Sequence, residues 1–210
     1  MGKALGNGGQ GRLIVDLEGY LVQVETSKAW FAQRVLPLSV EQLRWRPSPQ
    51  KWSIGECLDH LNLMLELYLP KVDDAIAGWR NGRATEGCPA WEDSEMEALR
   101  QVEPPVRVRV VAPPEVIPSQ AVDADRLVDH FEVTRDRYAD AVRRSRGLDV
   151  VRIRVVDPVY PVIQTLGGTL AFIAAHDRRH IWQAERVRNT RQFPRALFAS
   201  WRKNGQPEDL

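Results

Sequence analysis

The stretch that decides the fold is TLAFIAAHDRRHIWQAERVR, residues 169–188. Its apolar residues recur at steps of three and four, which is the period of an amphipathic helix. His176 and His180 lie four residues apart in it, so both imidazoles project from the same side of that helix. Two interpretations stay open. The histidines either hold one metal ion, or they lie on a partly exposed face and bind water.

Outward from this stretch, three other segments have the same helical period. Four long amphipathic helices without an internal repeat predict an all-α protein, a four-helix bundle. Thr165 to Thr169 bracket the expected start of the last helix, which ends near Arg188. The other helices are expected over residues 12–35, 54–79 and 123–145.

The residues at the helix ends support these boundaries. Ser39 is expected to cap a brief helical turn. Ser53 and Glu56 have the Ser-x-x-Glu spacing of a capping box, in which each side chain binds the other residue's backbone N–H. Pro70 lies inside the second helix and is expected to kink or split it.

The connection over residues 81–122 differs from the rest of the chain because it contains six prolines. Connections this long are typically functional or disordered. Within it VRVRVV, residues 106–111, alternates like a short strand, as does VRIRVV at 151–156. We expect the two to pair as a small β-ribbon. The chain thus reads as one bundle domain, residues 12–190, with a flexible N-terminal tail (1–11) and a C-terminal extension (191–210).

Composition excludes several classes of partner. The chain has 29 basic and 28 acidic residues, so it lacks the basic surplus that nucleic-acid binding needs. No apolar run is long enough to span a membrane, and the N-terminus has no signal-peptide pattern. We therefore expect a cytoplasmic protein. Two cysteines, Cys57 and Cys88, indicate neither a disulfide framework nor a cysteine-based zinc site; Cys57 is expected to be a small buried hydrophobe.

A third metal ligand is available on the second helix. His60 lies beside the apolar stripe of that helix, near enough to reach the interior of a bundle. Three imidazoles, His60, His176 and His180, would make an open site with room for water or substrate. Imidazole suits zinc, nickel or iron. The fourth histidine, His130, is expected to be solvated.

Several neighbours could assist this site. Glu56 lies one turn before His60, where it could orient the ring or act as a base, or could serve only the capping box. Gln183 lies about one turn after His180. Of Arg178 and Arg179, one is expected to face solvent and the other, for which Arg179 is the candidate, to meet an anionic substrate group. The chain has no HExxH and no Glu-x-x-His motif, which excludes a zincin protease and disfavours a ferritin-like di-iron site.

Two of these stretches together resemble the DinB-like superfamily. KWSIGECLDHL, residues 51–61, matches its W-S-x-x-E-x-x-x-H-L motif, and FIAAHDRRHIWQAERV, residues 172–187, matches its H-x-x-R-H motif followed by Gln. The resemblance implies an up-down-down-up four-helix bundle, often a homodimer, with His60, His176 and His180 as the metal triad. Glu56 and Gln183 match recurrent positions without an assigned role.

The resemblance also indicates a function. Characterised relatives include S-transferases and isomerases that use a low-molecular-weight thiol (mycothiol, bacillithiol or glutathione) with a divalent metal. We therefore expect a divalent metal, most readily zinc or nickel, a thiol cosubstrate and a small electrophile. A metal-dependent hydrolase and a non-catalytic metal-binding stress protein remain the alternatives.

Overall fold

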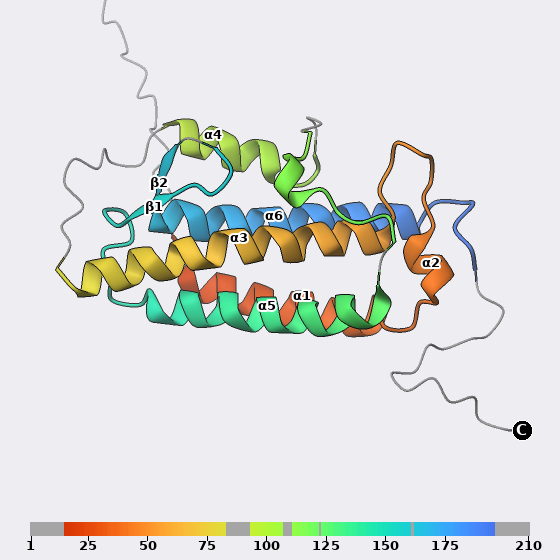
Figure 1. The fold of residues 1–210 in the computed structure, drawn as a ribbon, viewed down its shortest axis with the longest axis horizontal. Helices are drawn as coiled ribbons and strands as arrows, with labels where there is room; N and C mark the ends of the chain where they lie inside the picture. The colour runs from red at the N-terminus through yellow and green to blue at the C-terminus, as the bar shows by residue number, and fades with distance from the viewer. Residues whose placement is uncertain (1–14, 83–92, 107–110, 122, 161, 196–210) are drawn as a thin grey trace, which may run out of the picture.

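Four long helices form the body of the protein, as the sequence predicts (Figure 1). A computed structural model describes residues 15–82, 93–106, 111–121, 123–160 and 162–195. The four helices of the bundle are α1 (Leu17–Arg34), α3 (Ile54–Arg80), α5 (Ala124–Arg144) and α6 (Leu166–Arg188). The smaller elements are α2 (Val40–Arg44), α4 (Asp93–Val102), the 3-10 turn η1 (Pro114–Val116), β1 (Arg154–Val156) and β2 (Ile163–Thr165).

The helices are arranged up-down-down-up, with α1 and α6 running one way and α3 and α5 the other (Figure 1). Because α3 and α5 are parallel neighbours, the chain must return along the whole bundle between them. The long connection makes this return, and it contains α4 and η1, which the sequence pattern did not predict. In the view of Figure 1, α4 lies outside the bundle, above α6.

The predicted caps are present. The Ser53 hydroxyl accepts a hydrogen bond from the Glu56 backbone N–H, and the Glu56 carboxylate accepts one from the Ser53 N–H. Ser39 and Gln42 form a second capping box at the start of α2. Pro70 does not split α3, which continues to Arg80. Burial of the flanking Leu69 and Val72 in the core offsets the hydrogen bond that the proline removes.

The expected β-ribbon is only partly observed. Residues 154–156 are a strand, but its partner in the described chain is β2, which follows it in a short antiparallel hairpin. Adjacent antiparallel strands are the easier pairing because only a short loop separates them. Residues 107–110 of the other expected strand lie outside the described residues, as do the tail 1–11 and residues 196–210 of the extension. Among the described residues no helix is both long and apolar enough to cross a membrane.

The apolar core consists of two clusters separated along the helix axes. One cluster surrounds Tyr68, Tyr138 and Leu170. The other surrounds Phe31 and Phe131, whose rings stack with centroids 4.2 Å apart. Between the two clusters each long helix contributes polar side chains to the interior. This central polar layer comprises Ser27, His60, Asn62, Thr134, Arg135, His176, Asp177 and His180.

Candidate metal centre

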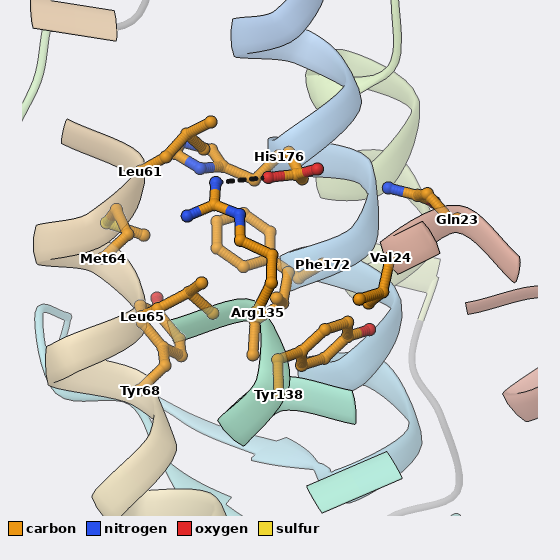
Figure 2. A pocket seen from close by; sticks show the side chains of 12 residues that line it. Gln23, Val24, Leu61, Met64, Leu65, Tyr68, Arg135, Tyr138, Phe172 and His176 are labelled. Atoms are coloured by element: carbon orange, nitrogen blue, oxygen red, sulfur yellow. Dashed lines mark hydrogen bonds and ion pairs between the residues drawn. The ribbon is translucent and has the colours of Figure 1, made fainter. Parts of the chain in front are cut away.

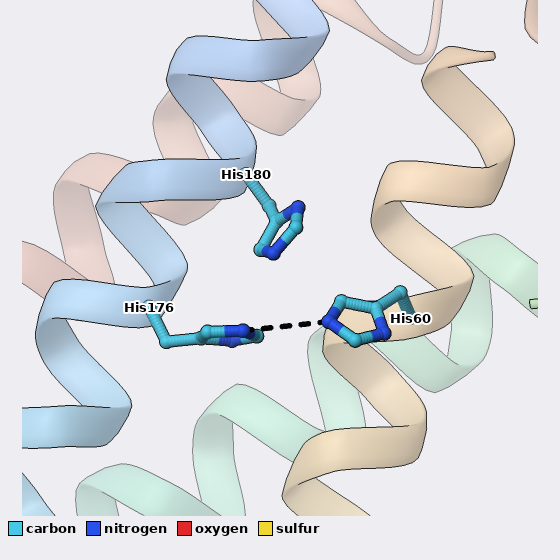
Figure 3. Close-up of side chains that lie close together, drawn as sticks. All are labelled: His60, His176 and His180. Carbon is cyan, nitrogen blue, oxygen red and sulfur yellow. Dashed lines mark hydrogen bonds between the residues drawn. The ribbon is translucent and has the colours of Figure 1, made fainter. Parts of the chain in front are cut away.

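Three imidazoles meet in the central polar layer. His60 projects from α3 toward His176 and His180 on α6, and one nitrogen atom from each ring lies within 4.8 Å of the other two (Figure 3). The Nε2 atoms of His60 and His176 are 3.3 Å apart. His60 and His180 are buried, whereas His176 keeps partial exposure. The structure therefore brings together the three histidines that the sequence suggested as ligands.

A backbone carbonyl orients the His60 ring. Nδ1 of His60 lies 2.6 Å from the carbonyl oxygen of Val116 in η1, and this nitrogen is the donor because a carbonyl can only accept. The tautomer that donates from Nδ1 leaves a free lone pair on Nε2, which faces the other histidines. The long connection thus contributes to the site. Sequence reasoning missed Val116, since a backbone contact across 56 residues has no side-chain signature.

Burial keeps the three rings neutral. Desolvation lowers the pKa of His60 to about 4 and brings the pKa values of His176 and His180 well below their ordinary value. The positive charge of Arg179 lowers all three as well. Neutral imidazoles at pH 7 have the lone pairs that a metal ligand requires.

Aromatic side chains enclose the triad. The Trp52 ring centroid is 4.8 Å from that of His60 and 5.8 Å from that of His180. Phe172 lies against His176 at 5.5 Å. Nδ1 of His180 is buried and finds no hydrogen-bond partner among the described residues. Such a dry, apolar surround strengthens electrostatic attraction to a cation.

Glu56 does not orient His60. Its buried carboxylate accepts hydrogen bonds from Nε of Arg46 at 2.7 Å and from the Ser53 backbone N–H at 2.9 Å. The orienting bond to His60 comes from Val116 instead. The structure therefore places Glu56 in the capping box and an ion pair, the simpler of its two predicted roles.

The two arginines between His176 and His180, Arg178 and Arg179, have different surroundings. Arg178 forms an ion pair with Glu103 and a hydrogen bond with Gln23. Arg179 is half-buried, donates to the Gln101 carbonyl oxygen at 3.2 Å and lies close enough to influence the three histidines. Arg179 is thus the arginine associated with the triad.

The remaining candidates lie at the margin of the site or outside it. Gln183 is half-buried and lies near enough to His180 to raise the pKa of that ring, against the larger effect of desolvation, although Nδ1 of His180 has no hydrogen bond within the described residues. His130 is not simply solvated: its Nε2 lies 2.7 Å from a carboxylate oxygen of Glu66. Cys57 is fully buried, as predicted, and burial raises the pKa of its thiol. Cys88 lies outside the described residues.

A narrow cavity lies beside the triad, along the bundle interior (Figure 2). Its volume is about 20 Å³, enough for one water molecule or a small apolar group. His176 forms one wall of it. The other walls are mainly apolar and include Leu61, Met64, Leu65, Tyr68 and Phe172.

Residues 23–184 match the family model of the DinB superfamily. The chain belongs to the DinB superfamily. The matched region includes all four bundle helices in whole or in part and all three histidines. No curated protein and no solved structure matches the chain.

The residues of this DinB-superfamily site fit a divalent metal ion. Two nitrogens that bind one zinc ion tetrahedrally, each at about 2.0–2.1 Å, lie about 3.3 Å apart. The Nε2 atoms of His60 and His176 already have this separation. Without a metal, one of these two imidazoles can donate an N–H hydrogen bond to the lone pair of the other. A divalent cation would replace this single hydrogen bond by bonds to the lone pairs of all three rings.

Proposed function

We propose that this protein is a metal-dependent thiol S-transferase that joins a low-molecular-weight thiol to a small electrophile. The convergence of three neutral imidazoles carries the proposal. Three protein ligands leave coordination positions open for a substrate, unlike a closed structural site with four protein ligands. His60, His176 and His180 would hold the ion, most readily zinc or nickel.

A bound divalent metal would lower the pKa of a thiol that joins it, so that the thiolate is present at neutral pH. The chain's own groups have separate tasks. The Val116 carbonyl keeps the His60 lone pair directed at the site. Trp52 and Phe172 exclude water from two sides of the triad.

Arg179 favours the binding of a negatively charged reactant. Its guanidinium lies close enough to the three rings to lower their pKa values, and the same positive charge would attract a thiolate or a carboxylate of the thiol cosubstrate. His176 is the partly exposed member of the triad, and we propose that the reactant enters beside it. In the proposed transfer the thiol first loses its proton to solvent. A sulfur–carbon bond then forms as the bond from that carbon to the leaving group breaks, and the leaving group departs with the electron pair.

Metal analysis is the first test. The purified protein should contain about one zinc or nickel ion per chain, and His60→Ala should contain none. His130→Ala is the matched control, because His130 lies outside the triad and pairs with Glu66; this variant should keep its metal. A wild-type protein that takes up no divalent metal would exclude the proposed function.

The second test separates transferase from hydrolase. Conjugation of 1-chloro-2,4-dinitrobenzene is measured with glutathione, bacillithiol and mycothiol in turn, beside hydrolysis of a nitrophenyl ester without thiol. Thiol-dependent turnover that His176→Ala abolishes supports the transferase. Ester hydrolysis alone would favour metal-activated water, and metal binding without either activity would favour a non-catalytic protein.

A further inference from the structure

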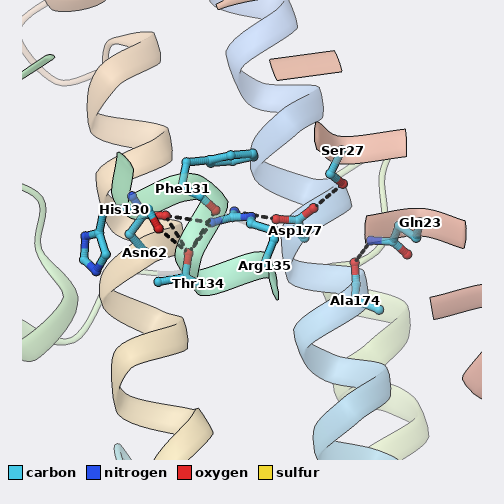
Figure 4. Close-up of polar contacts among 9 residues, drawn as sticks. All are labelled: Gln23, Ser27, Asn62, His130, Phe131, Thr134, Arg135, Ala174 and Asp177. Carbon is cyan, nitrogen blue, oxygen red and sulfur yellow. Dashed lines mark hydrogen bonds and ion pairs between the residues drawn. The ribbon is translucent and has the colours of Figure 1, made fainter. Parts of the chain in front are cut away.

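A network of hydrogen bonds crosses the whole bundle in the same layer as the triad (Figure 4). The side chains that link the helices are Ser27 on α1, Asn62 on α3, Arg135 on α5 and Asp177 on α6. Thr134 on α5 also bonds to Asn62 and Arg135. Each of the four long helices therefore contributes at least one side chain. The layer lies between the two apolar clusters, so the network interrupts the hydrophobic core.

Arg135 is the centre of this network. The residue is only 1% exposed, and its guanidinium carbon lies 3.7 Å from the centre of the Phe131 ring. One Nη atom donates to the Asp177 carboxylate at 2.6 Å, and the other donates to the Asn62 amide oxygen, also at 2.6 Å. The second carboxylate oxygen of Asp177 accepts a hydrogen bond from the Ser27 hydroxyl at 2.6 Å.

The hydrogen-bond partners of Arg135 on α3 and α6, Asn62 and Asp177, are close in sequence to histidines of the metal triad. Asp177 directly follows His176 on α6, and Asn62 is two residues after His60 on α3. One guanidinium thus links the two helices that carry all three histidines, at the level of those histidines. The guanidinium is planar and its donors are fixed in direction, so it sets both the distance and the orientation between its two partners.

The network is poorly suited to a role in stability alone. A buried ion pair contributes little to stability when apolar side chains could fill the same volume. Moreover, Nε of Arg135 and Nδ2 of Asn62 find no hydrogen-bond partner in the described part of the chain. Unpartnered buried donors are destabilising. The arrangement is better explained as one that fixes the positions of the helices relative to one another.

We propose that Arg135 and Asp177 are positioning residues that hold α3 and α6 at the separation and rotation the metal triad needs. This inference rests on the metal-binding part of the proposed function. It concerns neither the thiol nor the electrophile, so it can be tested without turnover.

Three variants loosen the network to different degrees. The pair Arg135→Met with Asp177→Leu replaces both charges by apolar side chains, so that no buried charge is left alone. Arg135→Lys keeps the positive charge but has a single ammonium group that cannot reproduce the fork to Asn62 and Asp177. Ser27→Ala removes only the hydroxyl group that donates to Asp177.

A second ion pair supplies the matched control. Arg144 on α5 pairs with Asp73 on α3, so it links two of the same helices, but far along the bundle from the histidines. The control pair is Arg144→Met with Asp73→Leu. Folding of every variant is followed by circular dichroism and urea unfolding in the presence of a chelator.

The readouts are the dissociation constant for Zn²⁺, from chelator competition, and the visible spectrum of the Co²⁺-loaded protein, which reports ligand geometry. We expect the double variant and Arg135→Lys to bind Zn²⁺ about 10-fold or more weakly, with a changed Co²⁺ spectrum. Ser27→Ala should shift affinity by a smaller factor, and the control pair should leave both readouts unchanged.

Each other outcome overturns the proposal. Folded Arg135→Lys and Ser27→Ala proteins with wild-type affinity and spectrum would show that the network has no part in the site, whether or not the double variant folds. An equal loss in the control pair would show a general effect of bundle stability. A wild-type protein that binds neither ion would remove the proposed function itself, whereas the preceding two results leave that function intact.

Discussion

The two halves of the central polar layer, the histidine triad and the Arg135 network, solve the problem of buried polar groups in opposite ways. In the network the guanidinium, the carboxylate and the hydroxyl bind one another, so the main charges are matched inside the protein. In the triad, Nε2 of His60 and Nε2 of His176 face each other at 3.3 Å, and Nδ1 of His180 has no partner among the described residues. The network matches its charges internally, although Nε of Arg135 and Nδ2 of Asn62 lack partners in the described chain, whereas the triad presents lone pairs.

Burial alone therefore does not determine whether a polar cluster maintains the fold or binds a cation. Both halves are buried between the same apolar clusters, and α3 and α6 contribute side chains to both. A cluster in which charged donors meet charged acceptors maintains the fold, whereas three neutral imidazoles whose nitrogens converge can bind a cation in place of a weak hydrogen bond between two of them. Four measurements can break or sharpen this distinction.

The largest expected effect is the loss of stability when the Arg135 network is broken. Arg135→Met alone leaves the Asp177 carboxylate without its cation and should lower the free energy of unfolding by about 3–5 kcal/mol, measured by urea unfolding of the metal-free protein. Arg144→Met breaks two ion pairs, with Asp73 and Asp140, whose groups are partly exposed, and should lose only about 1 kcal/mol. Similar losses for the two variants would contradict the special position of Arg135.

A substitution in the histidine triad should lower the affinity for Zn²⁺ without lowering the stability of the metal-free protein. His180→Leu removes one of the three proposed ligands and should weaken Zn²⁺ binding by more than about 100-fold, since even hydrogen-bond partners of ligands contribute up to that factor. The metal-free protein should be no less stable, because the replaced ring has an unpartnered buried Nδ1. A marked loss of stability without metal would mean that the imidazole serves the fold.

The third prediction concerns pH and the metal-free protein. Desolvation lowers the pKa of His60 from its ordinary value of about 6.5 in the unfolded chain to about 4 in the folded protein. Its contribution to stability is therefore present above pH 6.5 and is lost as the pH falls toward 4. Between pH 7 and pH 5 the loss should be about 2 kcal/mol. His60→Leu should show a correspondingly flatter profile; identical profiles would mean that the ring is not neutral in the fold.

The smallest effect is expected at Glu56. Glu56→Gln keeps the capping box, which accepts Gln in this position, but loses the charge that pairs with Arg46. Because the Arg46 side chain is partly exposed, the variant should lose about 1 kcal/mol. Its Zn²⁺ affinity should equal that of wild type. A clear fall in Zn²⁺ affinity would show instead that Glu56 takes part in metal binding.

Much of the fold was predictable from the sequence, because the period of apolar residues and the caps are local signals. Ser53 with Glu56 marked the start of α3, and Gly167 and Gly168 left only a few residues of doubt about the start of α6. Of the kink or split expected at Pro70, the split does not occur, since the buried residues on both sides of the proline compensate for the lost hydrogen bond. Helix α4 was missed because proline-rich surroundings masked its short period.

The sequence by itself determined the pair His176 and His180, because a spacing of four on one helix places two side chains together whatever surrounds them. It also supplied His60 as a candidate. Only the tertiary structure decided that His60 faces this pair, that Val116 orients it and that Arg135 ties the two helices beside it. The reason is physical: these contacts join residues 42 to 116 positions apart, and the packing of one helix against another, rather than the period of either, sets which side chains meet.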